Sequence, residues 1–268
     1  MWTSPHKRWL SRPVQRAAQI VLSPRAKDHN SSVRIKFVHL LFLAPLCLAQ
    51  PSNQLSAEEK TGGWKLLFDG ATTNGWTEVT GLPFPASWKI EDGCLKAIPN
   101  PQDMQDIRTV DKFKSFDLEF EWKLAKGGNS GVKYLVQKTD RWQRRNETGW
   151  QARARGLEYQ IVDDNNNEDA LSANTRVTAS LYSYIAPSKR LQVEMNVFHK
   201  SRILRNGNHV EHWLDGEKVL QFELTNPTVQ AALRSIGNSN SASLESFISL
   251  QNHNSEVWFR NIKIRRLE

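Results

Sequence analysis

The residues best suited to acid–base chemistry in this 268-residue chain lie in one short segment near its middle. Residues 157–161 alternate between apolar and polar side chains, so Glu158 and Gln160 share one face of an expected strand. Residues two apart lie about 7 Å apart along a strand, and an acid beside an amide at that spacing suits recognition of hydroxyl groups or proton transfer. The alternative is a solvated outer face, because exposed glutamates are common.

Two neighbouring segments could help to build a ligand site. The acidic run 163–169 carries carboxylate and amide oxygens of the kind that bind Ca²⁺, but its spacing is not that of an EF-hand, and a solvated loop is the simpler interpretation. The small residues at 127–131 permit close approach of a ligand to the backbone, although an ordinary hairpin turn would have the same pattern.

Gln251 and His253 form a second polar pair, on one face of an expected strand near the C-terminus. A histidine whose pKa lies near neutral can act as an acid or a base, although a single histidine is more often structural. The sequence contains no GxSxG, HExxH or P-loop motif, and the segment 127–131 is not a GxGxxG fingerprint. We therefore expect no nucleotide cofactor.

Turn residues and period-two alternation predict the all-β fold that would position these side chains. Residues 116–122 alternate strictly between apolar and acidic residues, and Asn-Gly and Asp-Gly pairs predict hairpin turns at 206–207 and 215–216. Only residues 226–235 suggest a short helix. Many short antiparallel strands are typical of a sandwich or jelly roll of two sheets. The expected strands are 87–90, 94–98, 116–122, 131–137, 157–162, 201–204, 209–214, 217–224, and a closing pair formed by 247–251 and 257–264.

The positive charge of the chain is concentrated in its N-terminal extension. Residues 1–36 hold eight Lys or Arg and one Asp, whereas the rest of the chain is almost neutral, although the whole chain has a formal charge of +8. A nucleic-acid-binding protein needs its positive charge on the folded surface, so we expect no nucleic-acid partner. With 24% charged and 39% hydrophobic residues, the body has the composition of a folded domain.

The N-terminal region has the features of a bacterial export signal. Two positive charges at 33–36, an apolar run from 37 and a small residue at Ala49 predict a signal peptide over 33–49. Residues 1–32 are then a disordered or wrongly included extension, 50–62 a loose leader, and 63–268 one domain that is exported to the periplasm or beyond the cell. The alternative is a cytoplasmic tail followed by a membrane anchor over 37–49, so that only an uncleaved signal would contact a membrane. Removal of the signal would leave Cys94 as one cysteine, which we expect to be a small buried hydrophobe.

Several short segments follow one another along the chain: 64–70, 74–76, 88–93, 116–122, 128–131, 158–163, 212–216, 250–253 and 259–262. Taken together in this order, they resemble the 3-keto-disaccharide hydrolase domain family, long known as a domain of unknown function. The resemblance implies a concanavalin A-like β-sandwich and a bacterial exported protein that acts on sugars by cleaving 3-keto-glycosides. It also implies that Asn129, Gln160, Asp163, Gln251 and His212 contact the sugar.

The same resemblance implies catalytic roles for Glu158, His253 and Arg260. The carbonyl at C3 of such a substrate acidifies the proton at C2, so a base (Glu158 or His253) can open an elimination across C1 and C2, and addition of water completes hydrolysis. The enolate would be stabilised by Arg260 or by a divalent cation held by Glu158, Asp163 and His253.

Three functions remain open at this point. The first is the glycoside-cleaving enzyme, favoured by a pocket that contains a carboxylate of raised pKa or a metal ion. The second is a carbohydrate-binding domain without catalysis, favoured by a shallow groove floored by Trp142 or Trp150. The third is a structural or partner-docking domain, favoured by a flat apolar patch. The sequence does not determine the oligomeric state.

Overall fold

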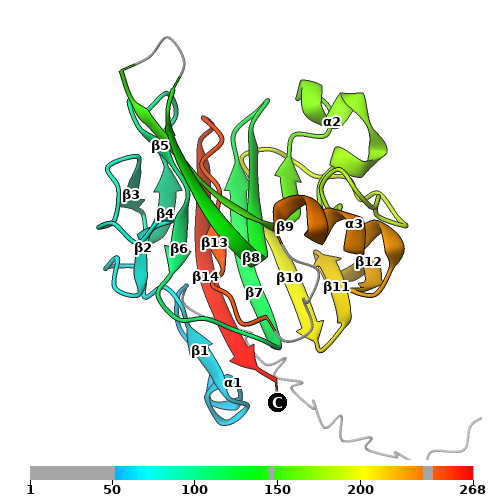
Figure 1. Cartoon of the computed structure of the whole chain (residues 1–268). Coiled ribbons are helices and arrows are strands. Elements are labelled where there is room, and N and C mark those ends of the chain that lie inside the picture. The colour runs from blue at the N-terminus through cyan, green and yellow to red at the C-terminus, as the bar shows by residue number, and fades with distance from the viewer. Residues whose placement is uncertain (1–51, 145–147, 238–243, 268) are drawn as a thin grey trace, which may run out of the picture. The chain divides into compact units, whose positions relative to one another are not determined.

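Two β-sheets that pack face to face form the body of the protein (Figure 1). The computed structural model describes residues 52–144, 148–237 and 244–267. The two-sheet β-sandwich predicted from the alternation of residues is confirmed. No helix in these three ranges is long and apolar enough to cross a membrane. The predicted extension 1–32 and signal peptide 33–49 lie outside the described residues.

The eight-stranded sheet is antiparallel throughout. Its strands follow the order β12-β11-β10-β7-β14-β4-β3, and β1 also pairs with β14. The strands of this sheet are β1 (Trp64–Leu66), β3 (Trp88–Glu91), β4 (Cys94–Ala97), β7 (Phe116–Leu124), β10 (His199–Asn206), β11 (His209–Leu214), β12 (Glu217–Glu223) and β14 (Val257–Arg266).

The six-stranded sheet is mixed, because β5 runs parallel to β9 while its other pairs are antiparallel. Its order is β2-β6-β13-β8-β9-β5. The strands of this sheet are β2 (Trp76–Glu78), β5 (Met104–Gln105), β6 (Ile107–Thr109), β8 (Asn129–Gln143), β9 (Trp150–Val162) and β13 (Ser249–Leu250). The helical segments are α1 (Ala57–Thr61), α2 (Glu168–Ser172), the 3₁₀ turn η1 (Asn174–Arg176) and α3 (Pro227–Ile236).

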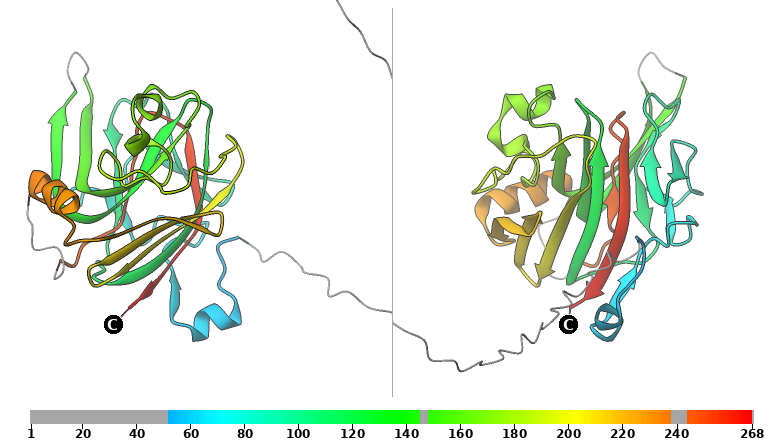
Figure 2. Two further views of the ribbon diagram at one scale, coloured as in Figure 1. Left: turned by 90° about the vertical axis from the view of Figure 1, so that its right-hand side faces the viewer. Right: turned by 180° about the vertical axis from the view of Figure 1, so that it is seen from behind.

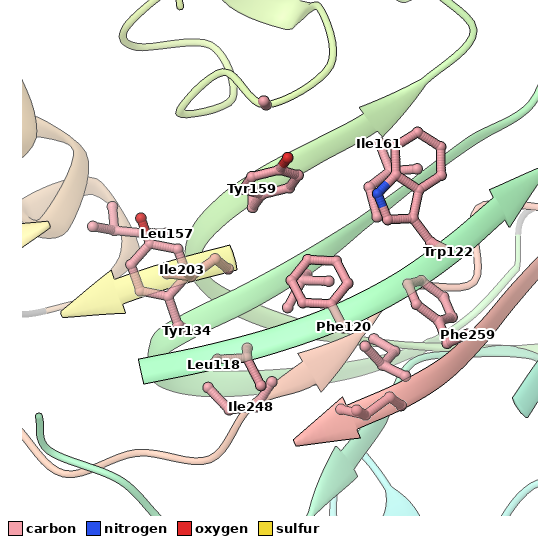
Figure 3. Close-up of a cluster of buried hydrophobic side chains, with 14 of the residues drawn as sticks. Leu118, Phe120, Trp122, Tyr134, Leu157, Tyr159, Ile161, Ile203, Ile248 and Phe259 are labelled. Atoms are coloured by element: carbon pink, nitrogen blue, oxygen red, sulfur yellow. The ribbon is translucent and has the colours of Figure 1, made fainter. Parts of the chain in front are cut away.

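The core lies between the inner faces of the two sheets (Figure 3). The apolar residues of β7 alternate inward, and Phe120 packs edge-on against Tyr159 of β9 with ring centroids 5.7 Å apart. Because Tyr159, Leu157 and Ile161 all belong to this core, the even-numbered residues between them face away from the eight-stranded sheet. The expected side of Glu158 and Gln160 is therefore confirmed. Cys94 is buried, as predicted.

Two predictions about the fold are wrong. Residues 247–251 and 257–264 do not form a closing pair, since β13 pairs with β6 and β8 whereas β14 pairs with β7 and β4 of the other sheet. Alternation shows that a strand is half-buried but does not identify its neighbour. The leader 50–62 is not loose where it is described, because α1 has a capping box and the buried Asn53 hydrogen-bonds to Gly93 and Asn261. The helix predicted at 226–235 is confirmed as α3.

Candidate functional site

A pocket of about 450 Å³ opens on the outer face of the six-stranded sheet. Most of its lining residues come from strands β8 and β9, from Asp169 of α2, from the segment 182–184 and from the end of α3. Figures 1 and 2 show where these strands and helices lie in the fold. Six of the polar residues that line it are Asn129, Lys133, Glu158, Gln160, Gln251 and His253. The structure thus brings together five of the residues that the sequence analysis selected, and it adds Lys133.

An irregularity in the β8–β9 pairing gathers these side chains on one face. Tyr134 pairs with Leu157, but the next pair is Lys138 with Arg155, so β8 has extra residues at this point. Gly156 lies at the irregularity, where an added Cβ atom would be 2.6 Å from the carbonyl oxygen of Tyr134. Across the bulge, the polar side chains of β9 that line the pocket change from odd-numbered (Gln151, Arg153 and Arg155) to even-numbered (Glu158 and Gln160).

Glu158 lies at the floor of this pocket with its side chain 12% exposed. Its carboxylate occupies space that only a glycine at position 131 leaves free, since an added Cβ atom there would overlap Oε1 of Glu158. Burial raises the pKa of Glu158, while Lys133, whose Nζ is 3.8 Å from Oε2, acts in the opposite direction. A carboxylate in this setting is a stronger base than an exposed one.

A buried ionic network supports Glu158 from beneath. Asp106 is fully buried and accepts hydrogen bonds from Lys133 Nζ at 3.1 Å and from Arg153 Nη1 at 2.5 Å. Burial alone would raise the pKa of Asp106, but these two cations hold it below its ordinary value. This network was not predicted from the sequence. One signal in the sequence could have indicated it, because charged residues occur within segments whose other residues predict buried strands.

Three buried amide side chains are available to bind a polar ligand. Gln160 Nε2 lies 3.4 Å from Asn129 Oδ1. The Oε1 atoms of Gln160 and Gln251 are buried and have no hydrogen-bond partner in the described part of the chain. A buried acceptor without a partner is unfavourable, and hydroxyl groups of a ligand are suitable donors. The amides therefore favour a ligand rich in hydroxyl groups.

His253 lies at the rim of the pocket, where it also lines an adjoining hollow with Asn129 and Asp169. Its side chain reaches solvent, yet protein atoms surround the hollow. This partial desolvation, together with the charges of Arg153 and Lys133, lowers the pKa of His253. The ring is therefore neutral at pH 7 and able to accept a proton.

The structure places three predicted site residues elsewhere. Arg260 belongs to β14 of the eight-stranded sheet, where its Nε donates to Glu121 Oε2 at 2.8 Å and its guanidinium covers Phe198. The prediction that Arg260 acts at the site is wrong, because the two sheets present opposite outer faces. Asp163 does not line the pocket either, since its carboxylate accepts hydrogen bonds from the backbone of Gly127 and from Asn166 and so holds a turn.

His212 is fully buried in the core rather than exposed to a ligand. Its Nδ1 lies 3.0 Å from the carbonyl oxygen of Ala179, and its Nε2 lies 2.8 Å from the hydroxyl of Tyr134. Burial lowers the pKa of His212 to about 4. The prediction that His212 binds substrate is wrong, since its strand position turns it inward between the sheets.

The predicted cation ligands are not assembled. Within residues 52–144, 148–237 and 244–267, no group of three or more His, Cys, Asp or Glu side chains could hold a metal ion. Of the predicted set, Asp163 is committed to its turn, which leaves Glu158 and His253. These residues do not fit the predicted metal site, and we derive no chemical step through a cation.

Comparisons with known proteins agree on one family. Residues 63–265 match the family of 3-keto-alpha-glucoside-1,2-lyase-like domains. A 3-keto-disaccharide hydrolase of Bacteroides thetaiotaomicron is 33% identical over 243 residues, which cover 82% of this chain and 84% of the relative. The crystal structure of a candidate glycosyl hydrolase from Parabacteroides distasonis is similar, with a TM-score of 0.67, 28% identity, and coverage of 81% of this chain and 100% of that one. A second candidate glycosyl hydrolase from that organism has a TM-score of 0.58 and 25% identity, over 76% of this chain and 99% of the other.

Proposed function

The chain belongs to the family of 3-keto-alpha-glucoside-1,2-lyase-like domains, the 3-keto-disaccharide hydrolase domain family, and on this premise we propose that it cleaves 3-keto-glycosides in the pocket around Glu158. Membership makes it a carbohydrate-active protein. The observation that carries the finer proposal is a largely buried carboxylate of raised pKa beside a buried cation, in a pocket lined by amides. Strongly perturbed groups in a cleft are typical of catalytic sites.

The first step removes the proton at C2 of the sugar. The C3 carbonyl acidifies that proton, and the carboxylate of Glu158 takes it as the general base. The electron pair of the C2–H bond forms an enolate on the C3 oxygen. Lys133 replaces Arg260 as the enolate-stabilising cation in this scheme, because its ammonium group lies 3.8 Å from Glu158 Oε2 and lines the same pocket.

The second step breaks the bond between C1 and the leaving oxygen. Collapse of the enolate forms the C1–C2 double bond and expels the leaving group as an alcohol. The leaving oxygen needs a proton, and His253 at the pocket rim can relay one from solvent. Addition of water then attaches its oxygen to C1 and returns a proton to C2, so the net reaction is hydrolysis to the free 3-keto sugar and the alcohol.

The test is turnover of a synthetic methyl 3-keto-glucoside by the purified domain, followed by NMR in D₂O with and without EDTA. We expect product that carries deuterium at C2, and no reaction with methyl glucoside, which lacks the acidic C2 proton. Glu158→Gln keeps the shape of the side chain and should lower kcat by about 10²- to 10⁴-fold. Undiminished turnover by this variant would remove Glu158 as the base.

A carbohydrate-binding domain without catalysis is the second candidate, because the ring of Trp142 also lines the pocket and sugar faces stack on aromatic rings. Saturable binding of both glucosides, with no product from either, would support this function over the enzyme.

We also propose that the protein is exported after cleavage behind Ala49, on the basis of the charge and apolar pattern of residues 33–49. Fractionation of cells that express the full chain, followed by N-terminal sequencing, tests this proposal. A mature protein in the cytoplasm that still begins at Met1 would contradict it.

A further inference from the structure

The pocket extends along β9 well beyond the residues assigned to the reaction. Arg155 precedes Glu158 by three residues, about 10 Å along the strand, and both line the pocket. Trp142 lines it as well, and it lies opposite Gln151, which is further along the same strand. A single sugar ring at Glu158 would leave this part of the pocket empty.

Two aromatic rings, one aliphatic side chain and the side chain of Arg155 line the far part of the pocket. We call Trp142, Arg155, Tyr184 and Ile236 the aromatic end. Trp142 comes from β8, Tyr184 from the segment after η1, and Ile236 from the last turn of α3. Gln151 and Arg153 of β9 also line this part of the pocket, together with the small residues Ala154 and Gly156.

Both aromatic rings of this end are held in place before any ligand arrives. The guanidinium of Arg155 lies over the ring of Trp142, with its Cζ 5.6 Å from the ring centroid, and its Nε donates a hydrogen bond to Asp140 Oδ2 at 2.7 Å. The hydroxyl of Tyr184 lies 3.1 Å from Ser235 Oγ of α3. Fixed rings lose little conformational entropy when a ligand packs against them.

Two polar side chains near the aromatic end have partners within the protein. Arg155 is paired with Asp140, and in its favoured amide orientation Gln151 accepts hydrogen bonds from Arg153. By contrast, the amide oxygens of Gln160 and Gln251 have no partner among the described residues. The pocket therefore offers free hydrogen-bond acceptors at one end and pre-positioned apolar surface at the other.

We propose that the aromatic end binds a flat aromatic aglycone, while the 3-keto sugar ring occupies the end that contains Glu158. This proposal rests on the function proposed above and names its preferred substrate class. A second sugar ring fits less well, because its hydroxyl groups would meet few free partners at Trp142, Tyr184 and Ile236.

The test compares benzyl, methyl and disaccharide 3-keto-glucosides of the same anomeric configuration. Trp142→Ala should lower kcat/KM for the benzyl substrate about 3- to 10-fold more than for the methyl substrate, as expected from the loss of one aromatic contact. Trp142→Phe should retain most of the preference. Trp150→Ala is the matched control: Trp150 lies on the same hairpin, under Arg141 at 4.9 Å, and outside the pocket. Trp150→Ala should change kcat/KM for neither the benzyl nor the methyl substrate.

The dissociation constants of benzyl and methyl 3-keto-glucoside for Glu158→Gln provide a readout that needs no turnover. When Trp142→Ala is added to Glu158→Gln, binding of the benzyl glucoside should weaken about 3- to 10-fold more than binding of the methyl glucoside, the same factor as expected for kcat/KM. Equal effects of Trp142→Ala and Trp150→Ala, or a loss for the disaccharide as large as for the benzyl substrate, would overturn the aromatic aglycone. Wild-type protein that neither binds nor converts any of the three substrates would instead overturn the proposed function itself.

Discussion

The carboxylate of Glu158 lies directly over the Cα of Gly131 on the neighbouring strand, in the space that a side chain there would fill. The two residues are not direct partners, because Gly131 pairs with Gln160 and Glu158 pairs with Lys133. Glu158 therefore leans across the sheet into a gap that glycine leaves open. A glycine within a strand often marks such a close approach.

Gly131→Ala should displace the carboxylate of Glu158 and lower kcat/KM on a 3-keto-glucoside by about 10²-fold, since misplacement of a catalytic group by about 1 Å has effects of this size. Gly207→Ala serves as the control, because Gly207 has a left-handed φ of 60° in a hairpin turn and no atom near its Cβ position. It should lower Tm but leave kcat/KM unchanged. If Gly131→Ala folds and retains full kcat/KM, the position of Glu158 does not matter to the reaction.

The rate should increase with pH through the ionisation of Glu158. A general base must be ionised, and burial raises the pKa of Glu158, so the acid limb of kcat/KM should have its midpoint above 4.5. Lys133 lowers that pKa, and Lys133→Met should therefore move the limb to higher pH as well as reduce the plateau. Lys138→Met removes an exposed cation from the same strand and should leave the midpoint in place. If Lys133→Met leaves the midpoint of the acid limb unchanged, the limb reports the ionisation of a group other than Glu158.

Asp106→Asn should destabilise the fold by about 3–5 kcal/mol, because it leaves Lys133 and Arg153 buried without their anion. The folded pKa of Asp106 is lowered, so its contribution is present above the unfolded pKa near 3.8 and is lost as pH falls through the folded pKa. Urea denaturation at pH 7 and near pH 3 measures both effects. The free energy of unfolding of Asp106→Asn should depend less on pH in the acid range than that of the wild type.

The exposed pair of Lys65 and Asp111 provides the control for this experiment, with N and O atoms 2.9 Å apart. Asp111→Asn should change the free energy of unfolding by less than about 1 kcal/mol. Equal effects of the two substitutions would show that the buried network contributes no more than a surface ion pair.

His212 should make the fold less stable as the pH falls from about 6.5 to about 4. The buried ring stays neutral in the folded state, whereas the unfolded chain binds a proton below pH 6.5, so acid favours unfolding by up to about 3 kcal/mol. His212→Gln cannot ionise and should flatten the dependence of the unfolding free energy on pH in this window.

His209 offers a control of opposite sign for the same measurement. Its hydrogen bonds to Glu223 and Glu211 raise its pKa, so it stabilises the fold at low pH and loses that effect as pH rises through the folded pKa. His209→Gln should therefore steepen the acid loss that His212→Gln flattens. Changes of the same sign in both variants would contradict the neutral, buried state assigned to His212.

Local pattern was enough to predict part of the fold and part of the site. The alternation of 116–122 identified β7, turn residues identified the hairpins, and parity placed Glu158 and Gln160 on the face opposite Tyr159. These properties depend on the backbone period of a strand, which each sequence segment carries by itself.

Partners that are distant in sequence were not predictable in the same way. The pairing of Asp106 with Lys133 and Arg153 joins β8 and β9 to the segment between β5 and β6. Arg260 lies in one of the segments that resemble the family, as the site residues do, yet its strand belongs to the eight-stranded sheet and not to the sheet of the pocket. No local property of a strand determines which sheet it joins.

The sequence by itself determined a two-sheet β body, the family, and the side of β9 on which an acid and an amide lie. Only the tertiary structure decided that Lys133 accompanies Glu158 and that His212 and Arg260 lie elsewhere. It also decided that Arg155 and Glu158, on either side of the β8 bulge opposite Gly156, both line the pocket. The physical reason is that period is set by neighbouring residues, whereas register, bulges and choice of sheet are set by packing between segments far apart in the chain.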